Sequence, residues 1–340
     1  MSSLGDVVHL LPAITDAVKA RPELKFDWVV EKGFSEIPAW HPAVDKVIPI
    51  ELRQWRKGPW EAFKNGAWHA FKKDLQVRTY AGVLDAQGLF KSSLVSLLAK
   101  GPRIGFDRNS AREGLASLFY NQKIEAPRGQ HAVERLRILF AKTFDYPIPT
   151  TPPDFGIDVN QLTPIKVSDR YLVFLHGTTW DTKHWPFIYW QQLIQKAQMV
   201  NFEIYLPWGN EAEYQRAQSL ATFAPNFVRV LPKLTLKEMT YVLAKAKGIV
   251  AVDTGLGHIA AALGRPVVSL YGPTDPGLTG AHGPQSQKLS STLPCAPCFK
   301  RSCTLETKDM IQPPCLKDIT PEQVWQTIYS KMTNEAAQSH

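Results

Sequence analysis

The stretch that decides the fold is Val250-Ala251-Val252-Asp253-Thr254-Gly255-Leu256-Gly257-His258-Ile259. The small and β-branched residues before Asp253 predict a buried strand, and the apolar pattern after Gly255 predicts a helix. A tight turn between them would aim backbone N–H groups and the positive end of the helix dipole at an anion. We therefore expect a phosphorylated ligand here. An ordinary strand–helix turn, capped by Asp253 or Thr254, is the alternative.

Strands alternate with helices along the rest of the chain. The expected strands cover residues 25–30, 44–50, 80–85, 171–175, 202–206, 227–231, 248–252 and 266–271. The expected helices cover residues 7–19, 60–77, 91–100, 110–122, 130–144, 187–199, 211–223, 236–247 and 321–333. This alternation predicts an α/β protein with two Rossmann-like, doubly wound, parallel-sheet domains.

A proline-rich connector between residues 146 and 164 marks the predicted domain boundary. The first domain is expected over residues 1–150 and the second over residues 151–316. Residues 317–340 should form a C-terminal helix that packs back towards the N-terminal domain. The carboxyl edges of the two sheets are expected to face each other across a cleft.

The first residues resemble a turn between a strand and its helix, because Gly5 and Asp6 precede an apolar helical pattern. In this sequence no strand comes before that turn, although such a strand usually lies in the middle of the sheet. Either the start codon is assigned too far downstream, or the domain lacks this strand.

The net charge of +8 over 340 residues favours an acidic partner: nucleic acid, an anionic membrane face or a phosphorylated substrate. With no apolar run of about 18 residues and no secretory signal, the sequence predicts a cytoplasmic protein. Residues 51–80 mix basic side chains with Trp55, Trp60 and Trp68. This mixture suits a membrane interface. It equally suits a solvated helix with tryptophans on its core face.

Four cysteines lie late in the chain, at Cys295, Cys298, Cys303 and Cys315. The C-x2-C spacing of the first pair resembles part of a zinc site. The later spacings are irregular, so reduced thiols in a loop are the preferred interpretation and zinc is the minority alternative. Disulfides are not expected in a cytosolic protein.

Polar residues at the ends of the later strands suit a nucleoside diphosphate. Hydroxyls, a lysine and a helix N-terminus match a diphosphate, and a carboxylate matches ribose hydroxyls. The chain lacks a G-x-G-x-x-G motif after a strand, a Walker loop and an Asp-x-Asp pair, so neither a dehydrogenase nor a metal-held diphosphate is indicated. Asp6 has two interpretations, a general base or a cap of the helix that begins at Val7.

Six runs carry a resemblance to the ADP-heptose:lipopolysaccharide heptosyltransferases, in the same order over nearly the whole chain. They are Ser3-Leu4-Gly5-Asp6-Val7-Val8-His9, Phe26-Asp27-Trp28-Val29-Val30-Glu31, Asp85-Ala86-Gln87-Gly88, Lys183-His184-Trp185-Pro186, Leu206-Pro207-Trp208-Gly209 and Val252-Asp253-Thr254-Gly255-Leu256-Gly257-His258. The second and fourth runs resemble the type I enzyme, which adds the first heptose to Kdo-lipid A. The cysteine-rich segment 294–315 looks more like type II.

The resemblance implies a GT-B fold and inverting, metal-independent transfer from ADP-heptose to Kdo2-lipid A, on the cytoplasmic face of the inner membrane. It makes Asp6 the catalytic base. The implied donor-binding residues are Thr178, Thr179, Lys183, Glu213, Asp253, Thr254, Gly255 and His258. The implied acceptor-binding residues are Arg53, Arg56, Lys57 and Arg112. ADP-heptose is a substrate, so no cofactor, metal or nucleic-acid partner is expected.

Three alternatives stay open at this point. The first is a type II enzyme that adds the second heptose, and the next is a nucleotide-sugar epimerase with the same fold. The third is a basic module that binds nucleic acid or membrane without catalysis, which leaves the clustered polar strand ends unexplained.

Overall fold

A computed structural model describes residues 3–58, 64, 66–305 and 313–338. The chain divides into two compact units, Met1–Asp158 and Val159–His340. The division lies inside the proline-rich connector. The first unit ends at Asp158, whereas the sequence predicted an end at residue 150.

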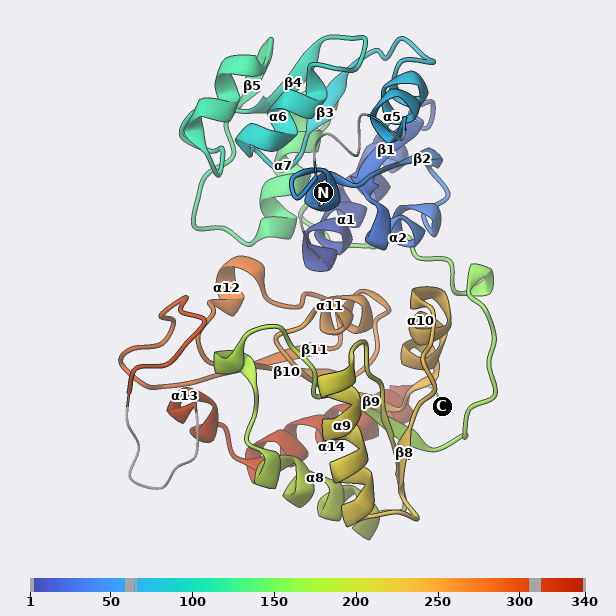
Figure 1. Ribbon diagram of the computed structural model, residues 1–340, viewed down its shortest axis with the longest axis vertical. Coiled ribbons are helices and arrows are strands. Elements are labelled where there is room, and N and C mark those ends of the chain that lie inside the picture. The colour runs from blue at the N-terminus through green and yellow to red at the C-terminus, as the bar shows by residue number, and fades with distance from the viewer. Residues whose placement is uncertain (1–2, 59–63, 65, 306–312, 339–340) are drawn as a thin grey trace. The chain divides into compact units, whose positions relative to one another are not determined.

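The C-terminal unit is built on one six-stranded sheet with the order β11-β10-β9-β6-β7-β8 (Figure 1). Every pairing in it is parallel. The strands are β6 (Tyr171–Leu175), β7 (Glu203–Leu206), β8 (Val228–Val230), β9 (Gly248–Val252), β10 (Val267–Tyr271) and β11 (Ser286–Ser290). The chain fills one side of β6 and then returns to the other with β9. The strand order therefore reverses between β6 and β9, where open α/β sheets bind ligands at the carboxyl ends of their strands.

Helices cover this sheet because its central strands are apolar throughout. All five residues of β6, β9 and β10 are buried, as expected for strands covered on both faces. The helices are α8 (Phe187–Met199), α9 (Glu211–Phe223), α10 (Leu236–Lys245), α11 (Gly255–Ala262), α12 (Pro276–Thr279), α13 (Pro314–Lys317) and α14 (Pro321–Gln338).

The C-terminal helix α14 belongs to the core of this unit. It lies against α8, β9 and β10, and its Val324 and Ile328 are fully buried in the same cluster as α8 and the central strands. Each such side chain contributes about 1.5–3 kcal/mol by leaving water. The expected packing of this helix towards the N-terminal domain stays a prediction.

The N-terminal unit has two small parallel sheets. One pairs β1 (Phe26–Glu31) with β2 (Val44–Ile50), and the other has the order β3-β4-β5. These three strands are β3 (Val83–Asp85), β4 (Arg103–Phe106) and β5 (Gln122–Ile124). The helices are α1 (Leu4–Ala20), α2 (Glu36–Ala39), α3 (Leu52–Trp55), α5 (Ala67–Leu75), α6 (Phe90–Ser96) and α7 (Ala132–Phe144), with 3-10 turns η1 (Lys32–Phe34) and η2 (Gly114–Phe119).

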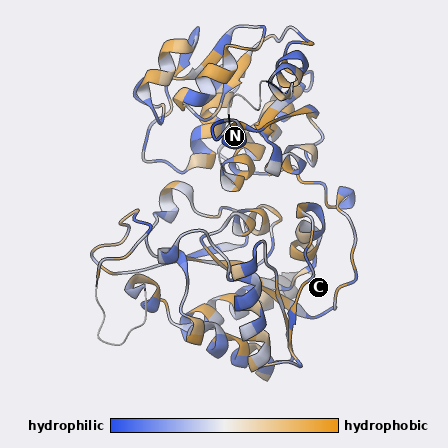
Figure 2. Ribbon diagram, in the orientation of Figure 1, coloured by the Kyte–Doolittle hydropathy of each residue, from blue (hydrophilic) through white to orange (hydrophobic). Residues whose placement is uncertain are grey.

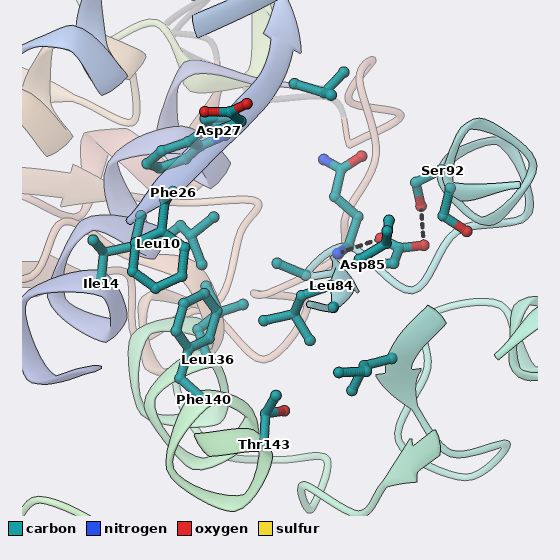
Figure 3. A pocket seen from close by; sticks show the side chains of 18 of the residues that line it. Leu10, Ile14, Phe26, Asp27, Leu84, Asp85, Ser92, Leu136, Phe140 and Thr143 are labelled. Atoms are coloured by element: carbon teal, nitrogen blue, oxygen red, sulfur yellow. Dashed lines mark hydrogen bonds between the residues drawn. The ribbon is translucent and has the colours of Figure 1, made fainter. Parts of the chain in front are cut away.

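A cavity of about 290 Å³ separates the two sheets. Leu10 and Ile14 of α1, and Leu136 and Phe140 of α7, form part of its apolar wall, and Leu84 lies on its β3 side (Figure 3). Within the described residues, β1 pairs with β2 alone and β3 pairs with β4 alone. Each of these two strands therefore presents its other backbone edge towards the cavity. The cavity is thus a gap between β1 and β3, which do not pair with each other in the described part of the chain.

Several local predictions differ from the structure. The predicted helix over residues 110–122 is wrong: the segment forms the short turn η2 and then β5. The sequence pattern did not predict β4 and β11, because these strands are short and partly polar. The predicted helix over residues 60–77 is present as α5, whereas residues 59–63 and 65 lie outside the described part of the chain.

Candidate active site

The two strand ends at the reversal point meet through Thr178 and Asp253. Thr178 follows β6, and its hydroxyl donates to the backbone carbonyl of Asp253, which follows β9, at 3.3 Å. Thr179 is exposed in the same loop. The structure thus brings together residues that are 75 positions apart in the sequence, at the edge where the sheet topology predicts a ligand.

Lys183 is held in place by Asp253. Its Nζ lies 2.6 Å from Asp253 Oδ2, and the two side chains are only 15% and 13% exposed. Thr274, which follows β10, donates its hydroxyl to the same carboxylate oxygen at 2.7 Å. The loops after β6, β9 and β10 therefore converge on one ion pair, which fixes the lysine at the sheet edge.

A second cation contacts the same aromatic ring as Lys183. The Nζ of Lys183 lies 4.3 Å from the centroid of the Trp180 ring, and the guanidinium carbon of Arg301 lies 5.2 Å from the same centroid. Thr182 donates its hydroxyl to the carbonyl of Lys300 at 2.7 Å, which ties the two segments together. Arg301 was not predicted as a site residue, because it lies in the cysteine-rich segment far from any predicted strand end.

Helix α11 begins at the same edge. Thr254 is its N-cap, and among the described residues its side chain makes no capping hydrogen bond. The backbone amides from Gly255 onwards begin the helix, so its positive end lies at the ligand edge. Gly257 allows α11 to lie close to β9, since a Cβ there would be 3.3 Å from the Cβ of Ala251. His258 is buried, one turn into the helix.

Glu213 lies in the first turn of α9, the helix that follows β7. Its Oε2 accepts from the backbone N–H of Gly209 at 2.7 Å, and its own N–H donates to the side chain of Asn210 at 3.0 Å. A Cβ on Gly177 would lie 2.5 Å from the Glu213 carboxyl carbon. Glycine at 177 therefore leaves the room in which the carboxylate sits against the end of β6.

A pocket of about 260 Å³ opens beside Glu213 and Thr254. Its other lining residues are mostly apolar and come from β6, the loop after β7 and the start of α10: Leu175, Gly177, Pro207, Trp208, Gly209, Pro232, Leu234, Thr235, Leu236, Met239 and Leu256. The indole N–H of Trp208 donates to the carbonyl of Leu231 at 2.7 Å, which fixes that wall. Met239 and Leu234 were missed, because their apolar pattern also fits an ordinary core helix.

A neutral histidine is buried directly after β6, beneath the ligand edge of the sheet. His176 directly follows β6 and is fully buried. Burial, helped by the positive charge of Arg216, lowers its pKa to about 4. His176 is therefore uncharged at neutral pH and adds no positive charge to the site.

In the N-terminal unit, Asp6 lies in the first turn of α1, bonds to the N-cap residue Ser3 and forms an ion pair. The Ser3 hydroxyl donates to Asp6 Oδ2 at 2.8 Å and accepts from the Asp6 N–H at 3.2 Å. Asp6 Oδ1 lies 2.7 Å from Arg112 Nη2, and the Asp6 side chain is 17% exposed. The predicted cap is wrong in its position, because α1 begins at Leu4 rather than at Val7, its N-cap is Ser3, and Asp6 lies in its first turn. The carboxylate also stays accessible at the mouth of the sheet cavity, which both residues line.

The other predicted acceptor residues, Arg53, Arg56 and Lys57, lie on or directly after α3 and are exposed. The structure thus brings Arg112 to Asp6 and places these three cations on another element of the same unit. Trp55 and Trp68, near these cations, are half-buried. The rings of Trp55 and Trp68 are 5.7 Å apart, and Trp55 packs on the buried core around α5. Trp60 lies outside the described residues.

The four cysteines are free thiols, of which Cys315 is buried and Cys295 and Cys303 are exposed. Burial, together with the neighbouring thiols, raises the pKa of Cys315 to about 11. Throughout the described ranges, no three His, Cys, Asp or Glu side chains are grouped so that they could hold a metal ion. The zinc alternative therefore finds no ligand set there. The described helices also include none that is long and apolar enough to span a bilayer.

Known proteins match the chain over most of its length. The model of glycosyltransferase family 9 (heptosyltransferase) matches residues 68–308. Lipopolysaccharide heptosyltransferase 1 of Pseudomonas aeruginosa is 51% identical over 333 residues, which cover 95% of this chain and 94% of that protein. The structure of E. coli heptosyltransferase WaaC with ADP superimposes with a TM-score of 0.86 at 44% identity, over 97% of this chain and 98% of that one.

The structure of E. coli ADP-heptose lps heptosyltransferase II matches at 22% identity with a TM-score of 0.72, over 99% of this chain and 98% of that one. At this identity the likeness concerns the fold alone. These comparisons agree with the predicted GT-B fold and with its two parallel-sheet domains. The chain belongs to glycosyltransferase family 9, the heptosyltransferases.

Proposed function

We propose that the chain is a heptosyltransferase of type I. It transfers heptose from ADP-L-glycero-D-manno-heptose in the synthesis of the lipopolysaccharide inner core, and its acceptor is a Kdo sugar of Kdo2-lipid A. The observation that carries this proposal is the ion pair between Lys183 and Asp253 at the end of β9, beside the pocket that Glu213 lines. The 51% identity to a type I relative favours type I over type II.

The donor site has a separate place for each part of ADP. The apolar pocket between Trp208 and Met239 suits the flat adenine base. Glu213 lies at its edge and suits the ribose hydroxyls, as acidic residues do in other nucleotide sites. The start of α11, with Thr178 and Thr179 opposite, suits the diphosphate. The E. coli relative was solved with ADP, which supports this assignment.

The chemistry divides between the two units. A hydroxyl oxygen of the acceptor Kdo attacks the anomeric carbon of heptose, and Asp6 accepts the proton of that hydroxyl. The bond from the anomeric carbon to the diphosphate oxygen breaks, and the electron pair leaves with ADP. Attack on the face opposite the leaving group inverts the configuration. Lys183 and the positive end of α11 stabilise the negative charge of the departing diphosphate.

Metal independence is part of this proposal. Lys183 is held at the sheet edge, and Arg301 shares the Trp180 ring with it. Together with the helix dipole they supply positive charge for a leaving diphosphate. Arg53, Arg56, Lys57 and Arg112 would bind phosphates and carboxylates of the acceptor. Because that acceptor is a lipid, we place the enzyme at the cytoplasmic face of the inner membrane.

The experiment separates transfer from donor cleavage. The protein is incubated with ADP-heptose, with and without Kdo2-lipid A and in the presence of a chelator. Release of ADP should depend on the acceptor and should be unaffected by the chelator. Consumption of ADP-heptose without an acceptor would favour the epimerase alternative, and loss of activity with the chelator would contradict metal independence.

A further inference from the structure

Two neighbouring elements of the N-terminal unit have inverted polarity. Helix α6 and the turn η2 lie side by side, and the rings of Phe90 and Phe119 touch edge to face at 5.6 Å between centroids. A helix on the surface of a protein in water normally buries its apolar face and exposes its polar one. These two elements do the opposite.

The buried face of α6 consists mostly of serines. Ser92, Ser93 and Ser96 are buried, and each satisfies its hydroxyl locally. Ser92 donates to Asp85 at 2.7 Å, Ser93 to the carbonyl of Phe90 at 2.7 Å, and Ser96 to the carbonyl of Ser93 at 2.6 Å. The same pattern occurs in η2, where buried Ser117 donates to the carbonyl of Gly114 at 2.8 Å.

The outward face carries the large apolar side chains. The exposed fractions are 44% for Phe90, 41% for Leu94, 43% for Leu97, 62% for Leu115 and 71% for Leu118. We call these five residues the α6–η2 patch. Figure 2 colours the ribbon by hydropathy and shows hydrophobic, orange stretches among hydrophilic, blue ones in the N-terminal unit. Among the large apolar residues that the structure describes as exposed in this unit, the others are Val77 and Ile148. The exposure is thus concentrated rather than scattered, and such concentration marks an interaction surface.

Basic residues border the patch. Lys91 is next to Phe90 in α6, and exposed Lys100 follows the helix. Arg103 donates to the carbonyl of Phe119 at 2.8 Å, so it lies at the end of η2. Arg108 lies at the start of η2, since a Cβ on Gly114 would be 3.3 Å from its side chain. The rim also holds exposed Glu113, which accepts from the N–H of Phe90 at 2.6 Å, so with four basic residues it is cationic on balance. An apolar surface with such a rim matches an anionic bilayer, where the rim meets the headgroups and the apolar residues enter the acyl boundary.

We infer that the α6–η2 patch docks the enzyme on an anionic lipid bilayer. The inference rests on the proposed function in one respect, because a membrane-anchored acceptor gives the docking its purpose. Arg112 connects the patch with the proposed base, because it pairs with Asp6 at 2.7 Å and precedes Leu115 by three residues. Docking through the patch holds the base near the membrane surface from which the acceptor sugar projects. This places the membrane contact on α6 and η2 rather than on the half-buried tryptophans around α5.

The test is sedimentation with vesicles of phosphatidylethanolamine and phosphatidylglycerol, three parts to one, and with vesicles of phosphatidylcholine. The variant Leu115→Glu/Leu118→Glu removes the two most exposed leucines of the patch. The matched control is Ile188→Glu/Met199→Glu on α8, which makes the same charge change at residues that are 47% and 82% exposed. Wild type and control should bind the anionic vesicles. The patch variant should bind at least about tenfold more weakly, because a buried leucine contributes about 1.5–3 kcal/mol.

Since these leucines are exposed, the melting temperature of the patch variant should equal that of wild type. The variant Leu115→Ser/Leu118→Ser repeats the test without added charge. The inference is overturned if wild type does not bind the anionic vesicles, or if the patch variants bind as wild type does. It is also overturned if the patch variants, but not the control, convert a dimer into a monomer, because a second copy would then cover the patch.

Transfer to a water-soluble, deacylated Kdo acceptor separates this inference from the proposed function. Wild type and patch variants should transfer heptose to it equally well. Failure of wild type on every acceptor would refute the proposed function and leave vesicle binding as it is. Normal transfer without vesicle binding would refute the docking surface alone.

Discussion

The two units differ in the continuity of their parallel sheets. The C-terminal unit has an unbroken six-stranded sheet, and its central strands β6 and β9 carry the donor-site residues at their ends. The N-terminal unit has two small sheets with an apolar cavity between them, and Asp6 lies at the mouth of that cavity. A continuous sheet positions side chains through its backbone. In the N-terminal unit, by contrast, Asp6 depends on a helix cap and on its ion pair with Arg112.

The largest expected effect is a loss of turnover when the proposed base in the N-terminal unit is replaced, with ADP binding by the C-terminal unit kept. Asp6→Asn should lower turnover by at least about 10²-fold, because general-base catalysis contributes about 10²–10⁴-fold. Ser3 remains the N-cap of α1, and asparagine still offers an oxygen to its hydroxyl, so the fold and ADP binding in the C-terminal unit should be unchanged. Initial rates with ADP-heptose and Kdo2-lipid A, and calorimetry with ADP, measure the two properties. Wild-type turnover in this variant would exclude Asp6 as the base.

The next effect concerns the other unit. Lys183→Ala should weaken ADP binding by about 10- to 150-fold, since a hydrogen bond to a charged group contributes about 1.5–3 kcal/mol. It also leaves Asp253 without its partner at 2.6 Å. Calorimetric titration with ADP measures the change. Lys247→Ala is the control, because Lys247 is exposed and precedes β9 at the opposite edge of the sheet. Equal affinities for the two variants would refute the role of Lys183.

The difference between the sheets should also appear in hydrogen exchange. Amides of β1 and β3, which border the cavity, should exchange at least about tenfold faster than amides of β6 and β9, which are paired on both sides. Mass spectrometry of peptides after deuterium labelling measures this. Equal protection in both units would contradict the idea that the gap weakens the N-terminal sheet.

The same gap can be tested by filling it. If a strand is the natural occupant, eight residues rich in valine and isoleucine joined ahead of Ser2 should protect β1 and β3 and raise the melting temperature. The rise should be roughly 2–4 °C per kcal/mol gained. A glycine–serine segment of equal length is the control. A domain complete without this strand, the other explanation from the sequence, would show no difference between the two extensions.

The last comparison concerns the pH dependence of stability. Each unit holds a neutral buried histidine, His41 and His176, whose pKa burial lowers from 6.5 to about 4. The unfolded chain takes up these protons first as the pH falls. Stability should therefore be complete above pH 6.5 and decline towards pH 4, by about 1.4 kcal/mol per pH unit for each histidine. Urea denaturation from pH 7 to 4 measures the slope. His41→Gln should reduce the slope of the N-terminal unit; an unchanged slope would exclude His41 as its cause.

How much the sequence could predict follows from the distance over which each signal acts. Thr178, Asp253 and Glu213 directly follow strands or begin helices, so a local pattern found them. Arg301 joins the site through tertiary packing on Trp180, the ring that Lys183 also contacts, and no local pattern marks it. The pairing of Asp6 with Arg112 could not be predicted either, because the two residues are 106 positions apart in the sequence. The helix prediction over residues 110–122 was wrong for a related reason. Leu115 and Leu118 of η2 are exposed, but in the sequence their spacing resembles the buried face of a helix.

The measurement that tests the central claim most directly is the mass of the lipid product. Protein, ADP-heptose and Kdo2-lipid A are incubated with a chelator, and the lipid is analysed by mass spectrometry for wild type and Asp6→Asn. The account predicts that wild type adds one heptose to the lipid and that Asp6→Asn adds almost none in the same time. An unmodified lipid with active wild-type protein, or equal product from both proteins, would contradict it.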